Sequence, residues 1–107
     1  MYEGYLGEIR MFTTDSVPEG WLPCDGRTVQ IRDNPALFSL FGTAYGGNGR
    51  ETYALPDLRA RIPVHMVDDH RIGDRVAAIS GGGRAEEQPF LALNLCICVA
   101  GVFPHRA

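Results

Sequence analysis

Large apolar and small residues alternate along residues 90–103, which read FLALNLCICVAGVF. A two-residue period is typical of a β-strand whose two faces differ chemically. The large aliphatic positions are Leu91, Leu93, Leu95, Ile97 and Val99, and the small or weakly polar positions are Ala92, Asn94, Cys96, Cys98 and Ala100. No charged residue interrupts the run, so both faces of the predicted strand need cover.

The small face of this predicted strand indicates an assembly interface. If the large positions face the subunit's own core, the small face lets a neighbouring chain approach closely. Asn94 then needs a hydrogen-bond partner at that contact. We therefore expect an oligomer whose interface includes residues 92–100, with the five small positions as its contacts.

A short helix is predicted over residues 34–42, where the period changes. Asn34 is a good N-cap, Pro35 suits the first helical position, and Gly42 can end the helix in a left-handed conformation. Leu37, Phe38 and Phe41 lie three and four residues apart, which gives the helix one apolar face. About two turns of helix packed onto a sheet are expected.

The rest of the chain is divided by 13 Gly and seven Pro into short pieces, which favours a mainly β protein. We expect a first strand at 6–13, a short strand or loop at 21–24, and a hairpin arm at 28–31 after the Asp25-Gly26 turn. Further strands are predicted at 62–67 and 76–79. Loops are predicted at 45–50, 68–75 and 80–88. The glycine-rich loop at 45–50 lacks the lysine and hydroxyl residue of a phosphate-binding loop.

Length and charge narrow the possible functions. A chain of 107 residues with 45% hydrophobic content predicts one domain over residues 1–107. The net charge is -3 with mixed signs, so neither nucleic acid nor an anionic membrane is an expected partner. The apolar run near the C-terminus is shorter than the roughly 20 residues of a membrane helix. The N-terminus does not read as a signal peptide, so we expect synthesis in the cytoplasm.

Candidate catalytic and metal-binding residues are weakly supported. Three cysteines are an odd number for a disulfide framework, and we interpret them as small buried residues. The cluster Asp68-Asp69-His70 does not define a metal geometry. A hydrolase built from Cys24, His65 and Asp57 has no supporting spacing. We therefore expect no enzyme activity, no metal and no cofactor.

Several polar and aromatic residues are better candidates for contacts. Asp57, Arg59 and Arg61 alternate, and we expect the two arginines to fix the junction between helix and sheet or between protomers. Trp21 is interpreted as a core anchor rather than a sugar-stacking platform, because a single Trp in a small domain usually supplies buried area. Tyr45 and Tyr53 are the candidates for surface binding of a ligand.

Five blocks of the sequence together resemble the phage tail collar domain family, in particular the small proteins described as microcystin-dependent. These blocks are LGEIRMF at 6–12, PEGWLPCDG at 18–26, ALFSLFGTAYGGNG at 36–49, LPDLRARIPV at 55–64 and QPFLALN at 88–94. The resemblance implies a small tail-collar-like β domain, mainly β with one short α-helix. It also implies a tail-fibre or tail-tip module, usually a trimer, that binds and holds rather than catalyses.

This chain departs from the family pattern in its middle region. The resemblance implies a long insertion before the QPFLALN block, often with a His-x-His element, whereas only residues 67–87 fill that interval and no His-x-His occurs. We therefore expect a non-enzymatic structural or assembly subunit of a phage tail, a phage-like injection machine or a filament. The expected partners are copies of itself, as a trimer or a polymer, and other tail or tip proteins. The alternative is a trimeric adhesion module that binds a cell-surface glycan.

Overall fold

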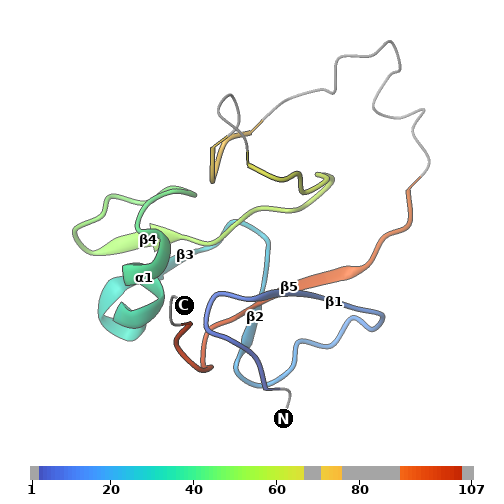
Figure 1. The fold of residues 1–107 in the computed structure, drawn as a ribbon, viewed down its shortest axis with the longest axis horizontal. Coiled ribbons are helices and arrows are strands. Elements are labelled where there is room, and N and C mark those ends of the chain that lie inside the picture. Colours follow the sequence, from blue (N-terminus) through green and yellow to red (C-terminus); the bar gives the residue numbers. More distant parts are fainter. Residues whose placement is uncertain (1–2, 67–70, 76–89, 105–107) are drawn as a thin grey trace.

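The computed structural model describes residues 3–66, 71–75 and 90–104, and they form two antiparallel sheets and one short helix (Figure 1). The five strands are β1 (Ile9–Phe12), β2 (Trp21–Pro23), β3 (Thr28–Gln30), β4 (Thr52–Ala54) and β5 (Asn94–Cys98). A 3-10 turn, η1 (Ile31–Asp33), leads into α1 (Pro35–Phe41). The expected mainly β fold with one helix is confirmed. Among the described residues, no helix has the length and apolar character needed to cross a membrane.

The central strand of the larger sheet is β5, which lies between β1 and β2. Ile9 stands opposite Ile97 in one pairing, and Trp21 stands opposite Cys98 in the other. Since residues opposite each other in an antiparallel sheet share a face, Ile9 and Ile97 lie on one face, and Trp21 and Cys98 lie on the other. The strand predicted for residues 90–103 is thus confirmed over Asn94–Cys98 only.

The helix is held by the capping residues that the sequence predicts. The Asn34 side chain accepts a hydrogen bond from the Leu37 N–H, Pro35 occupies the first helical turn, and the Gly42 N–H donates to Phe38. Gly42 has a positive φ of 56°, although its ψ of −128° is not that of a left-handed helix. The Nδ2 of Asn34 also donates to the Val99 carbonyl at 2.6 Å, which ties the helix to the residue after β5.

Two clusters of buried side chains lie on the two faces of β5. The larger cluster joins both sheets to the helix, and its buried members are Leu6, Cys24, Leu37, Tyr53, Leu55 and Ile97. The smaller cluster contains Trp21, Cys96 and Cys98, with Phe12 packed against them. Figure 1 shows α1, β3 and β4 together on one side of β5, and the larger cluster contains residues from α1 and β4.

The structure corrects two strand predictions. Residues 28–31 do not form a hairpin with the preceding strand, because β3 pairs with β4, and Thr28 stands opposite Ala54. The Asp25-Gly26 turn instead joins the two sheets, since the Gly26 N–H donates to the Pro56 carbonyl at 3.2 Å. Residues 62–66 are not a strand. The predicted strand at 76–79 and the connector at 80–88 lie outside the described residues.

Candidate assembly surface

The small face of β5 is covered by its own chain. Cys96 and Cys98 are buried beneath Trp21, whose indole meets the Phe12 ring edge-on at a centroid distance of 5.4 Å. The Arg10 guanidinium lies 5.0 Å from the centre of the Trp21 ring. The small side chains of the two cysteines make room for the indole of their own chain, and their expected contact with a neighbouring chain stays a prediction. Trp21 is a core anchor, as predicted.

The other three interface candidates on this segment lie nearer the surface. Asn94 is half-buried, and its amide nitrogen donates to the Ser16 carbonyl at 3.1 Å, so its predicted partner comes from the β1–β2 loop of the same chain. Ala92 and Ala100 are exposed. Of the five small positions, these two alanines are the most exposed, whereas Asn94 is half-buried and the two cysteines are buried.

The three cysteines are free thiols inside the core. Burial raises the pKa of Cys24 to about 12, so its sulfur stays protonated at neutral pH. A protonated, buried thiol is a poor nucleophile. Among the described residues, no group of three or more His, Cys, Asp or Glu side chains is placed to hold a metal ion.

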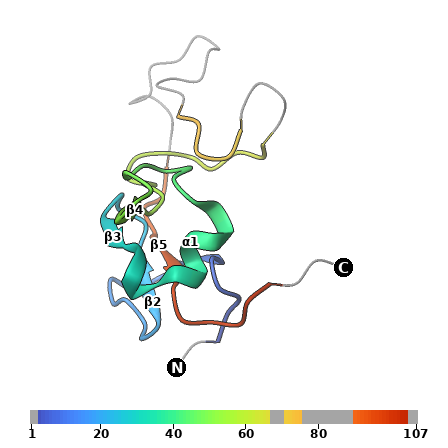
Figure 2. The ribbon, with the colours of Figure 1, turned by 90° about the vertical axis from the view of Figure 1, so that its left-hand side faces the viewer.

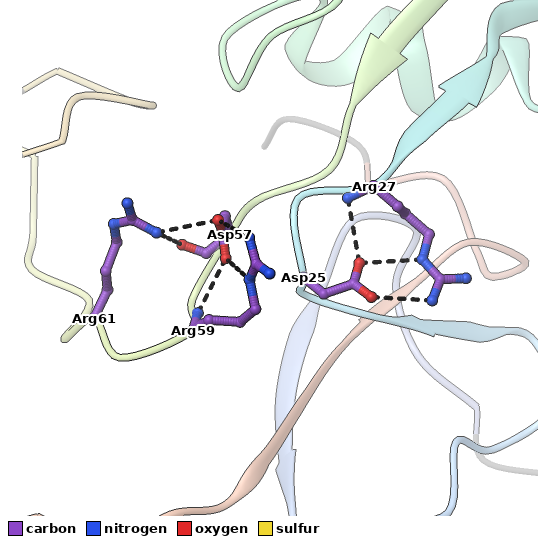
Figure 3. Close-up of polar contacts among 5 residues, drawn as sticks. All are labelled: Asp25, Arg27, Asp57, Arg59 and Arg61. Carbon is purple, nitrogen blue, oxygen red and sulfur yellow. Dashed lines mark hydrogen bonds and ion pairs between the residues drawn. The ribbon is translucent and has the colours of Figure 1, made fainter.

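Asp57 binds both arginines of the predicted contact (Figure 3). Its carboxylate accepts from Arg59 Nε at 2.8 Å and Nη2 at 2.9 Å, which is a bidentate pair, and Arg61 Nη1 lies 3.2 Å from Oδ2. The hydrogen bond from Arg59 and the nearby positive charges hold the pKa of the Asp57 carboxyl far below its usual range. These pairs lie within one chain, and the Arg59 side chain remains 71% exposed.

Asp25 and Arg27 form a second bidentate ion pair, on the segment that lies beside Asp57 (Figure 3). Asp25 accepts from Arg27 Nε at 3.1 Å and Nη2 at 3.0 Å, and the hydrogen bond lowers the pKa of the Asp25 carboxyl. Asp25 and Asp57 are bridge partners. Gly26 has a φ of +77°, and a Cβ added to it would lie 3.0 Å from the Asp57 Cβ. Each Asp-x-Arg ion pair is local to its own motif, and the two segments are joined by backbone hydrogen bonds, from Gly26 to Pro56 and from Leu58 to Cys24.

The two tyrosines do not form an exposed aromatic surface. Tyr53 is fully buried, and its hydroxyl donates to the Asn34 carbonyl at 3.1 Å. Tyr45 is half-buried and packs edge-on against Phe41 at a centroid distance of 5.1 Å. Tyr53 and its neighbour Ala54 in β4 are both buried, and the Tyr53 ring packs against Phe38 and Phe41 of the helix.

The surface carries large apolar residues that sequence reasoning did not assign to it. Thirteen such side chains are exposed in the described residues, whereas ten hydrophobic residues form the buried core there. The exposed residues are Tyr5, Ile9, Met11, Val17, Ile62, Val64, Met66, Ile72, Phe90, Leu91, Leu93, Val102 and Phe103. Leu91 and Leu93 were expected in the core. They are exposed because neither β1 nor β2 extends far enough to flank them.

The alternation Ile62, Val64, Met66 was the signal for part of this surface. It is the pattern of a strand with one buried face, but these three side chains are between 54% and 67% exposed. The alternation therefore does not mark a face that the described part of the chain buries.

Comparison with known proteins supports the resemblance seen in the sequence. The chain is 44% identical over 55 residues to the short tail fiber protein gp12 of Enterobacteria phage T4, a match that covers 50% of this chain and 10% of that protein. The matched region is therefore a small part of the T4 protein. No solved structure gives a significant match. The family model described as the phage tail collar domain matches residues 7–63, more than half of the 107 residues. The chain therefore belongs to the phage tail collar domain family.

Proposed function

We propose that this protein is a non-enzymatic assembly subunit of a phage tail, a phage-like injection machine or a filament, and that it works as a homo-oligomer. The observation that carries the proposal is the excess of exposed large apolar side chains over buried hydrophobic residues in the described part of the chain. Large contiguous apolar patches are rare on soluble monomers and common at permanent interfaces, and six of the thirteen exposed side chains fall in two short segments, 62–66 and 90–93.

Membership of the phage tail collar domain family supports the same function, because the family is named for a part of phage tails. The chemistry of the described residues points the same way. The carboxylates of the two Asp-x-Arg motifs are paired with arginines of their own motifs, and the three thiols are buried. A core cluster shared by both sheets and the helix supports a single domain over residues 1–107.

Electron micrographs of the purified protein test this proposal. Uniform closed particles or filaments are the expected result, since a chain that covers its apolar surface with copies of itself forms regular objects. A field without particles at high protein concentration contradicts the proposal. A glycan array run on the same sample separates this function from adhesion, because a purely structural subunit leaves every glycan unbound.

A further inference from the structure

Residues 90–93, which we call the β5 lead-in, project past both neighbours of the central strand. β1 ends at Phe12, opposite Asn94, and β2 ends at Pro23, opposite Cys96. Among the described residues, no strand lies beside the lead-in. Its sequence nevertheless continues the alternation of β5, and Phe90 and Leu91 are 86% and 83% exposed. The lead-in therefore has the sequence of a strand without the neighbours of one.

Residues 62–66, the apolar segment after Arg61, have the same property. Ile62, Val64 and Met66 alternate with Pro63 and His65, yet within the described residues this segment pairs with no strand. Pro63 has no N–H, so the edge suited to pairing is the one that uses the N–H groups of residues 62, 64 and 66. One usable edge is enough for an interface with a single partner strand.

Both segments face the same side of the molecule. In Figure 1 and in Figure 2, residues 61–66 lie beyond β4 on the upper side, and residues 90–93 rise from β5 toward that side. Together they carry six of the thirteen exposed large apolar side chains: Ile62, Val64, Met66, Phe90, Leu91 and Leu93. In the described part of the chain, each segment offers an unpaired backbone and apolar side chains, so each can serve as the neighbouring strand that the other lacks.

We infer that the apolar segment 62–66 of one copy docks as a β-strand on the β5 lead-in of a second copy. This inference rests on the proposed self-assembly and names the surface that performs it. A second copy is the fitting partner because every chain carries both halves of the contact in equal number. Main-chain hydrogen bonds supply affinity in such strand addition, and the alternating side chains supply specificity. The contact is head-to-tail, so repetition closes a ring or continues a filament.

Two lysine variants and their mixture test this arrangement. Val64→Lys damages the apolar segment, and Leu91→Lys damages the lead-in. Each variant alone is expected to weaken self-association about tenfold or more, because a charge is placed in an apolar contact. Mixed in equal amounts, they form a heterodimer that grows no further, since Leu91→Lys keeps its apolar segment and Val64→Lys keeps its lead-in. Light scattering measures the masses.

Val102→Lys is the matched control, because Val102 is a 63% exposed valine that lies beyond the opposite end of β5 from the lead-in. It is expected to assemble like the unmodified protein. Fluorescence of the buried Trp21 checks that each variant is folded. A mixture that stays monomeric, a single variant that assembles normally, or a control that fails to assemble overturns the inference. If the unmodified protein assembles in these cases, the proposed function survives; if the unmodified protein is monomeric at every concentration, the proposed function fails as well.

Discussion

Asn34 joins three parts of the fold, and its replacement gives the sharpest test of how the helix is held. Its Oδ1 accepts from the Leu37 N–H at 3.3 Å, its Nδ2 donates to the Val99 carbonyl at 2.6 Å, and its own carbonyl accepts from the Tyr53 hydroxyl. Asn34→Ala removes the first two of these bonds and leaves the third. The helix then loses its cap and its tie to the chain after β5.

The expected loss follows from the two bonds. Removing an N-cap costs about 1 kcal/mol, and removing a net hydrogen bond costs about 1 kcal/mol more. Asn34→Ala is therefore expected to lower the free energy of unfolding by about 2 kcal/mol, with a Tm roughly 8 to 16 °C lower. Asn34→Ser retains a capping oxygen but does not reach Val99, so about half of that loss is expected.

Urea unfolding followed by Trp21 fluorescence measures these differences, because Trp21 is the single tryptophan and is buried. All variants are compared at one protein concentration, since assembly makes stability depend on concentration. Ser39→Ala is the control: Ser39 is exposed in the same helix, and its hydroxyl bonds only to the nearby Ala36 carbonyl. It should stay within about 0.5 kcal/mol of the unmodified protein. An Asn34→Ala variant equally close to the unmodified protein refutes the reasoning.

Three further predictions concern backbone space, ion pairing and packing. Gly47→Ala should unfold at a much lower urea concentration than Gly42→Ala, although both glycines have positive φ. A Cβ on Gly47 would lie 2.4 Å from the Tyr53 Cα, whereas a Cβ on Gly42 meets nothing within 4 Å, so equal midpoints would contradict this prediction. The lowered pKa of Asp57 predicts that its contribution to stability is complete above about pH 4 and is lost as the pH falls toward the folded-state pKa. The urea midpoint of Asp57→Asn should therefore fall less steeply with acid than that of the unmodified protein, and parallel curves would exclude the effect. Cys96→Leu should lower the Tm because the added carbons overfill the space beneath Trp21, at a cost of about 1–3 kcal/mol, and a variant of unchanged Tm would show that the small face is not tightly packed.

Local signals in the sequence predicted local structure well. The helix was found from Asn34, Pro35 and Gly42, since caps act within a few residues of where they stand in the sequence. The first two strands were also found, with shorter bounds than expected. The partner of β3 was not found, because β4 begins at Thr52, far along the chain, and the nearer Asp25-Gly26 turn resembles a hairpin signal.

The two faces of β5 show a different limit of sequence reasoning. Alternation correctly separated the cysteines from Leu95 and Ile97, but it does not say which face the chain itself covers. That depends on Trp21, which is distant in sequence and adjacent in the sheet. The exposure of Leu91 was missed for a related reason: a strand extends only as far as its neighbours pair with it.

Sedimentation velocity of the unmodified protein over a wide concentration range tests the central claim most directly, namely that the chain covers its apolar surface with copies of itself. The single chain has a mass of 11.7 kDa. We predict a species of a fixed integer multiple of that mass, or a growing series, which dissociates on dilution. A folded species of 11.7 kDa at every concentration would contradict the account.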